Sequence, residues 1–189
     1  MRIGVLAVQG AFVEHINKLR QLDTDCLEIR KRSDLSKNIN GLILPGGEST
    51  AMRKLLVELE LLEPLKKMIT DGLPVFGTCA GMILLAKEIS DSDTHCFGTL
   101  DITVKRNAYG RQLGSFRCID KFDGKLIEMP FIRAPYARRI GENVKNLATH
   151  EDRIVAVRQD NQLATAFHPE LTNDTYIYEY FFDIIAKKK

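Results

Sequence analysis

The sequence predicts an α/β fold with an open, mostly parallel sheet flanked by helices, and with additional antiparallel strands in the second half. In the first half, short β-rich runs alternate with helical patterns, at 3–8, 12–22, 26–29, 41–44 and 50–62. This alternation is typical of βαβ units. In the second half the runs are all strand-like, at 97–104, 113–119, 131–132, 153–157 and 163–167. No helical pattern returns before Thr175.

The first and last helices are predicted from the spacing of their apolar residues. Phe12, Ile16, Leu19 and Leu22 recur at helical spacing, which indicates the sheet-facing stripe of one helix rather than a ligand site. A final amphipathic helix at 176–186 should cover one face of the sheet.

Length and composition favour one domain spanning residues 1–189. The chain is 44% hydrophobic, which is enough for one core. Its net charge of +2 comes from mixed charges, with a basic cluster at 187–189 that we expect to be a disordered tail. The sequence has neither the basic face nor the amphipathic basic helix of a nucleic-acid or membrane partner. Polar residues follow the first strand too soon for a signal peptide, which favours a cytoplasmic protein.

The four cysteines, Cys26, Cys79, Cys96 and Cys118, are widely spaced and form no Cys-x-x-Cys pair. We therefore expect neither a zinc site nor a disulfide framework, and no metal or organic cofactor. Cys26 and Cys118 lie in apolar runs and are interpreted as buried small hydrophobic residues. Cys96, beside His95, is left without a role.

The segment Gly77-Thr78-Cys79-Ala80-Gly81 follows an apolar run and precedes a helical one. It predicts a cysteine nucleophile elbow, in which flanking glycines remove Cβ atoms that would collide in a sharp strand-to-helix turn. Unpaired amides and the dipole at a helix N-terminus favour a thiolate there.

His168 is the best candidate for the base, because it ends an apolar run and precedes Pro169 and Glu170. In an extended chain, positions two apart point to the same side, so Glu170 can orient the His168 ring. Cys79, His168 and Glu170 would then form a catalytic triad. The alternative for His168-Pro169-Glu170 alone is a strand end with a polar turn.

The other three histidines are weaker candidates. We expect His15 to be a partly buried polar residue of the first helix, and His95 and His150 to face solvent from loops. None of the three has a comparably placed carboxylate in the sequence.

The segment from Pro45 to Thr50 contains consecutive glycines, which can direct backbone N–H groups at one point. The N–H groups of Gly47 and Ala80 would form an oxyanion hole. The alternative, which does not conflict with this, is a strand-to-helix turn with Ser49 or Thr50 as N-cap. A phosphate-binding P-loop is disfavoured because the Gly-Lys-Ser/Thr ending is absent.

In the elbow, the glycine loop and the His-Pro-Glu segment, the chain resembles the class I (triad) glutamine amidotransferases. Its resemblance is most specific to the glutaminase subunits of pyridoxal 5'-phosphate synthases. The motifs that carry this resemblance span nearly the whole chain: 7–11 with 14–15, 44–50, 106–112, 131–135 and 167–172. It implies a flavodoxin-like three-layer fold. It also implies hydrolysis of L-glutamine to glutamate, with ammonia passed to a separate synthase subunit in a hetero-oligomer.

The resemblance also implies a set of binding residues. Glutamine would be bound by Gly47, Glu48, Ser49, Arg106, Ile132 and Arg133. Arginine suits a carboxylate and glutamate suits an ammonium group. Gln9 and Gly10 would lie near the oxyanion loop and the partner interface, where the synthase subunit stimulates a weak basal activity.

Two rival functions stay open on the sequence alone. The chain could be another amidotransferase subunit or a cysteine hydrolase with a different γ-glutamyl or acyl substrate. It could also be a binding subunit without activity that keeps the fold for docking.

Overall fold

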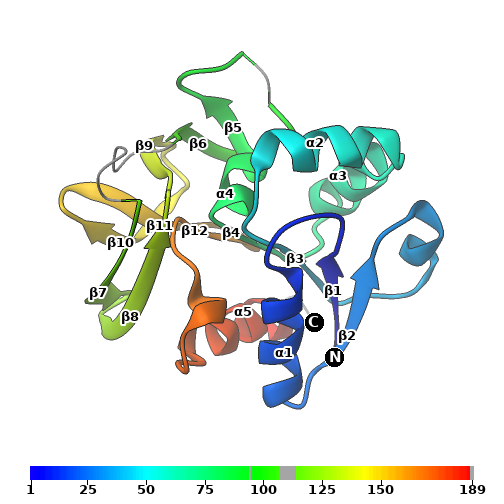
Figure 1. Cartoon of the computed structure of the whole chain (residues 1–189), viewed down its shortest axis with the longest axis horizontal. Helices are drawn as coiled ribbons and strands as arrows, with labels where there is room; N and C mark the ends of the chain where they lie inside the picture. The colour runs from blue at the N-terminus through cyan, green and yellow to red at the C-terminus, as the bar shows by residue number, and fades with distance from the viewer. Residues whose placement is uncertain (94, 107–113, 188–189) are drawn as a thin grey trace.

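The computed structural model describes residues 1–93, 95–106 and 114–187. A ten-stranded sheet crosses the described part of the molecule in the order β2-β1-β3-β4-β12-β11-β9-β6-β5, with β10 paired to β11 (Figure 1). Its strands are β1 (Arg2–Leu6), β2 (Asp25–Ile29), β3 (Gly41–Leu44), β4 (Val75–Thr78), β5 (Ala86–Ile89), β6 (Leu100–Lys105), β9 (Tyr136–Ile140), β10 (Lys145–His150), β11 (Arg153–Gln159) and β12 (Gln162–Thr165).

The strands β2, β1, β3, β4 and β12 form the parallel half of the sheet. Every residue of β3, β4 and β12 is buried. Burial on both faces explains why β3 is a continuous apolar run rather than an alternating pattern. In such a sheet the carboxyl ends of the parallel strands lie at one edge, where ligand sites form.

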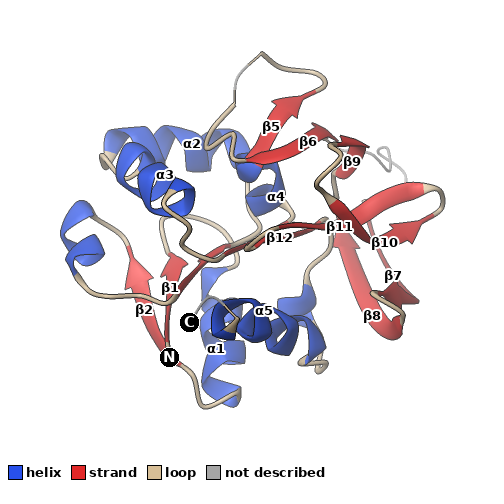
Figure 2. Cartoon of the chain, turned by 180° about the vertical axis from the view of Figure 1, so that it is seen from behind, coloured by secondary structure: helices blue, strands red, loops and turns tan. Residues whose placement is uncertain are grey.

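Helices cover both faces of this sheet. Helices α1 (Phe12–Gln21) and α5 (Tyr176–Ala186) pack on one face, whereas α2 (Ser49–Glu58), α3 (Leu62–Thr70) and α4 (Ala80–Leu85) lie on the other (Figures 1 and 2). Two short 3-10 turns, η1 (Arg32–Ser36) and η2 (Pro169–Leu171), complete the set of described helical segments.

The second half adds antiparallel pairing, as the sequence predicts. Strand β11 pairs antiparallel with β12, β10 and β9, and β9 pairs antiparallel with β6. A separate two-stranded antiparallel sheet consists of β7 (Ser115–Phe122) and β8 (Lys125–Ile132). The predicted fold class is therefore confirmed.

Several element boundaries differ from the prediction. The single helix expected at 50–62 is wrong, because the chain breaks at Glu60, which has a φ of 54°, and continues as α2 and α3. The elbow helix is short and runs directly into β5. Strands β5, β9 and β10 were not predicted from the sequence. Leu113 and residues 107–112 of the predicted 106–112 motif lie outside the described residues, as do residues 188–189 of the expected tail.

None of the helices in the described part of the chain has the length and apolar character needed to cross a membrane.

Candidate active site

Cys79 lies in the sharp turn between β4 and α4, with φ 48° and ψ −100°. A positive φ is unusual for a residue with a side chain. The flanking glycines are required by contact as well as by the turn. A Cβ on Gly77 would lie 2.6 Å from the Gly81 carbonyl carbon, and one on Gly81 would lie 2.1 Å from the Leu44 carbonyl oxygen. The turn therefore has the geometry of a nucleophile elbow.

Neighbouring parallel strands bring Cys79 and His168 together. The register pairs Thr78 of β4 with Thr165 of β12, one residue before the cysteine and three before the histidine. The Cys79 amide donates to the Thr165 carbonyl at 2.8 Å, and the His168 amide donates to the Pro130 carbonyl at 2.8 Å. These backbone bonds fix both residues at the edge of the sheet.

His168 and Glu170 form a close buried pair. The Nδ1–H of His168 donates to Glu170 Oε1 at 2.6 Å, and each residue is 6% exposed. Burial opposes the charged imidazolium, but interactions with Cys79 and Glu170 outweigh it and raise the pKa of His168 to about 10. Burial also opposes the carboxylate, yet His15 and the His168 bond lower the pKa of Glu170. Cys79 and Glu170 therefore both interact with the same imidazole ring.

His15 is fully buried, so the expectation of a partly buried residue is wrong. Its Nε2 lies 3.6 Å from the second carboxylate oxygen of Glu170, so His15 does have a carboxylate nearby. The ring also hydrogen-bonds Thr78 Oγ1 at 3.1 Å through Nε2 and the Tyr178 hydroxyl at 2.7 Å through Nδ1. Burial lowers the pKa of His15.

The glycine loop after β3 packs against the loop after β1. The Ala11 amide donates to the Gly46 carbonyl at 2.9 Å, and the Glu48 amide donates to Gln9 Oε1 at 3.0 Å. Because C=O and N–H point to opposite sides of a trans peptide, the Gly47 N–H points away from Ala11. This loop touches the base directly, since a Cβ on Gly46 would lie 2.3 Å from His168 Cε1.

The second predicted oxyanion donor is the amide of Ala80, the first residue of α4. Amides in the first turn of a helix have no intrahelical acceptor, so this N–H is available to a ligand. Ala80 itself is buried.

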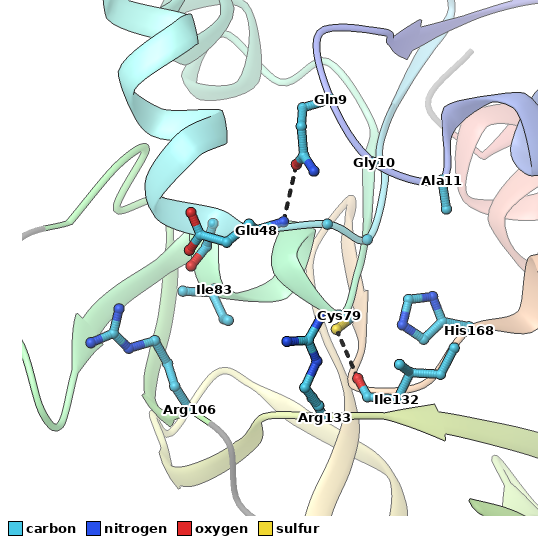
Figure 3. A pocket seen from close by; sticks show the side chains of 13 residues that line it. Gln9, Gly10, Ala11, Glu48, Cys79, Ile83, Arg106, Ile132, Arg133 and His168 are labelled. Atoms are coloured by element: carbon cyan, nitrogen blue, oxygen red, sulfur yellow. Dashed lines mark hydrogen bonds between the residues drawn. The ribbon is translucent and has the colours of Figure 1, made fainter. Parts of the chain in front are cut away.

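A pocket of about 400 Å³ opens over Cys79. Figure 3 shows the sulfur of Cys79 and the ring of His168 on one side of it, and the side chains of Glu48 and Arg106 on the other. The pocket is lined by Gln9, Gly10, Ala11, Gly46, Gly47, Glu48, Ser49, Cys79, Ile83, Arg106, Ile132, Arg133 and His168. Every residue that the resemblance assigns to glutamine binding is in this set.

Glu48 is the N-cap of α2, and the expected Ser49 or Thr50 cap is wrong. Its carboxylate accepts from the amides of Thr50 at 3.0 Å and Ala51 at 2.7 Å. Burial opposes the anion, but these two hydrogen bonds and the charge of Arg106 lower the pKa of Glu48. One carboxylate therefore caps the helix and faces the pocket.

The two pocket arginines are held differently. Arg106 is paired with Asp91, with Nη2 3.2 Å from Oδ2. Arg133 is exposed at the end of β8, where its backbone takes a φ of 44°. The carbonyl of Ile132 next to it lies 3.9 Å from Cys79 Sγ. The end of β8 therefore places a backbone carbonyl beside the nucleophile and a cationic side chain in the pocket.

The remaining histidines and cysteines lie away from the pocket. His95 is exposed in a loop, as expected. His150, expected in a solvent-facing loop, instead ends β10 half-buried, with Nδ1 3.1 Å from Asp120 Oδ2 and 3.6 Å from Cys118 Sγ. Burial raises the pKa of Cys96 to about 12.

Cys26 and Cys118 pack against the core but are half-buried, so their interpretation as buried small hydrophobic residues is wrong. Within the described ranges, no group of three or more His, Cys, Asp or Glu side chains is arranged to hold a metal ion.

A model of the SNO glutamine amidotransferase family matches residues 5–187. The chain belongs to that family. A pyridoxal 5'-phosphate synthase subunit PdxT from Methanocorpusculum labreanum is 56% identical, over 98% of each chain. Another protein of that name, from Haemophilus influenzae, is 53% identical over 97% of this chain and 98% of its own.

Solved structures of glutamine amidotransferases share the fold. A crystal structure titled glutamine amidotransferase superposes on this family member with a TM-score of 0.92 at 43% identity, covering 97% of this chain and 98% of that one. A glutamine amidotransferase from Thermotoga maritima superposes with a TM-score of 0.62 at 15% identity, covering 100% and 85%. The second likeness shows the fold alone.

Sequence reasoning missed three residues that support the site: His15, Tyr178 and Asp91. A signal for His15 was present, since it lies three residues after Phe12 and four before Leu19, on the buried stripe of α1. A polar residue on such a stripe needs a buried partner. Asp91 gave no such signal, because its pairing depends on the fold between β5 and β6.

Proposed function

We propose that this chain is the glutaminase subunit of a pyridoxal 5'-phosphate synthase, which hydrolyses L-glutamine to L-glutamate and ammonia and passes the ammonia to a synthase subunit. The observation that carries the proposal is a strained cysteine elbow beside a buried His168–Glu170 pair, at the floor of a pocket sized for an amino acid. The names of the relatives support the substrate and the partner.

In this mechanism the Cys79 thiolate attacks the side-chain amide carbon of glutamine. The oxyanion of the tetrahedral intermediate accepts hydrogen bonds from the amides of Gly47 and Ala80. The C–N bond then breaks, and protonated His168 gives its proton to the departing ammonia. His168 next takes a proton from water, which attacks the γ-glutamyl thioester; the C–S bond breaks, and glutamate leaves with the thiolate restored.

The far end of the pocket suits the amino-acid end of glutamine. The Arg106 and Arg133 guanidinium groups would bind the α-carboxylate, and the Glu48 carboxylate would bind the α-ammonium. Because Glu48 also caps α2, substrate binding is linked to the position of the glycine loop.

The loop contacts also support control by the partner. Gln9 and Gly10 hold the loop that carries Gly47, so a partner contact at Gln9 and Gly10 would set the position of one oxyanion donor. Each such donor is worth about 3–4 kcal/mol in the transition state. We therefore expect weak activity of the chain alone and stimulation by the synthase subunit.

The test measures glutamate release from L-glutamine, with and without a pyridoxal 5'-phosphate synthase subunit, with Cys79→Ala as control. The proposal predicts Cys79-dependent release that the partner stimulates. Hydrolysis of γ-glutamyl esters but not of glutamine would favour a different substrate. Glutamine-dependent synthesis that persists in Cys79→Ala would favour a docking subunit without activity.

A further inference from the structure

A buried chain of polar groups continues beyond the proposed triad. From Cys79 and His168 it passes to Glu170, then to His15 of α1 and the hydroxyl of Tyr178 of α5. His15 and Tyr178 are both 0% exposed. Neither lines the pocket, and the mechanism above uses neither.

The second oxygen of Glu170 is the least well hydrogen-bonded atom of this buried chain of polar groups. Oε1 accepts from His168, but Oε2 is buried and accepts no hydrogen bond within the described part of the chain. The Nε2 of His15, 3.6 Å away, faces it at the distance of an electrostatic contact. A buried carboxylate oxygen without such a neighbour would favour protonation of Glu170.

The surroundings of His15 select one tautomer. Tyr178 O–H can donate to Nδ1 at 2.7 Å, which leaves the proton on Nε2, where Thr78 Oγ1 accepts at 3.1 Å and the Glu170 anion lies nearby. The opposite tautomer would turn a nitrogen lone pair toward the carboxylate. Tyr178 therefore determines that His15 presents an N–H group, and not a lone pair, to Glu170.

We propose that His15 is a positioning residue for glutamine hydrolysis, which keeps Glu170 anionic and aligned on His168 through its Nε2–H, with Tyr178 setting the tautomer. This inference rests on the proposed function. Besides Glu170, the titratable groups around His15 are His168, Tyr178 and the adjacent Glu14. Of these only Glu170 is a buried carboxylate, since Glu14 is exposed.

Two substitutions of His15 separate positioning from packing. His15→Gln keeps an amide N–H near the place of Nε2, whereas His15→Asn keeps a polar group only near Nδ1. With the synthase subunit present, we expect His15→Asn to lower kcat/KM for glutamine about tenfold and to move the acid limb of its pH profile up by about one unit. His15→Gln should keep the wild-type profile.

Tyr178→Phe removes one hydroxyl and preserves the packing. It therefore tests the buried chain of polar groups even if a His15 variant folds poorly. We expect a loss of about threefold with an acid limb displaced in the same direction. His150→Gln is the matched control, because His150 also lies beside a carboxylate but outside the site. It should leave the profile unchanged.

A second readout needs no glutamine. The rate at which iodoacetamide alkylates Cys79, measured against pH, reports the His168–Glu170 pair directly and should shift in His15→Asn but not in His15→Gln. If the wild-type protein shows no glutaminase activity, the proposed function fails and alkylation alone decides the role of His15. Unshifted profiles in both His15→Asn and Tyr178→Phe, or equal losses at every pH in both His15 variants, would overturn the inference.

Discussion

At Cys79 the backbone is as informative as the side chain. Its φ of 48° costs of order 1–3 kcal/mol for a non-glycine residue. The hydrogen bond from its amide to Thr165 and the close packing of Gly77 on Gly81 hold the strained turn in place. A strained backbone persists only where surrounding contacts hold it in place. At Cys79 the strained turn places the sulfur beside the imidazole of His168.

Cys79→Ala is expected to abolish glutamine hydrolysis and also to lower the pKa of His168 from about 10. The reason is that the interaction with Cys79 helps to hold the proton on the ring against the effect of burial. An NMR titration of His168 Cε1–H in both proteins measures this. An unchanged pKa in Cys79→Ala would show that Cys79 and His168 do not interact.

Gly46→Ala is expected to reduce glutaminase activity at least a hundredfold, because the added Cβ would lie 2.3 Å from His168 Cε1 and displace the ring or the oxyanion loop. Gly114→Ala is the control, since no atom lies within 4 Å of a Cβ placed there. Steady-state assays with the synthase subunit measure both variants. Equal activity of the two would contradict the close contact between loop and base.

At the scale of elements, α1 connects the two halves of the site. It begins after the Gln9–Ala11 loop that holds the glycine loop, and it carries His15 toward Glu170. One turn further, the buried Lys18 donates from Nζ to the Thr172 carbonyl at 2.6 Å. Helix α1 therefore anchors the segment that contains the His168–Glu170 pair.

Lys18→Met is expected to lower the free energy of unfolding by about 1–3 kcal/mol, because it leaves the buried Thr172 carbonyl without its donor. Lys54→Met is the control, since Lys54 forms an exposed ion pair with Glu58, of a kind that contributes little. Urea denaturation measures both. A loss in Lys54→Met as large as in Lys18→Met would contradict an anchoring role for Lys18.

The elements that the sequence predicted correctly are those with local signals. The strand at 41–44 is a short apolar run that begins at Gly41 and is followed by Pro45. The run at 163–167 ends two residues before Pro169, and the elbow is defined by the two glycines around Cys79. Strand β9 was missed because its sequence, Tyr-Ala-Arg-Arg-Ile, has no clear alternation. It is a strand because β6 and β11 pair with it on both sides.

Among site residues, Cys79, His168 and Glu170 could be named from sequence because each belongs to a compact motif. The link from His15 to Glu170 joins positions 155 residues apart and depends on how α1 packs across the sheet. Spacing along the chain carries no information about such a contact. The cap at Glu48 was missed for another reason, since Ser49 and Thr50 offered the more common cap residues.

At the scale of the whole molecule, two buried groups make the fold sensitive to acid. The pKa of His15 is lowered from 6.5 and that of Glu170 from 4.5. The unfolded chain therefore binds more protons as pH falls below each of these values, and stability is lost in that direction. Each group contributes a slope of at most about 1.4 kcal/mol per pH unit.

We expect the free energy of unfolding to fall as the pH drops below about 6.5, and more steeply below about 4.5. Glu170→Gln should make the second, steeper part shallower, because glutamine does not titrate; other carboxylates with a lowered pKa, such as Glu48, keep their share of it. Urea denaturation at a series of pH values measures the two curves. Parallel acid limbs in the wild-type protein and Glu170→Gln would contradict an ionised Glu170 in the folded state.

The proposed reaction depends on attack by Cys79 on the side-chain amide carbon of glutamine. To test this, the protein is assembled with a synthase subunit and treated with an electrophilic chloroketone analogue of glutamine. Peptide mass spectrometry then locates the adduct. We expect one adduct per chain, on Cys79, formed more slowly when excess glutamine is present. Labelling of Cys26, Cys96 or Cys118 instead, or labelling of Cys79 that glutamine does not slow, would contradict it.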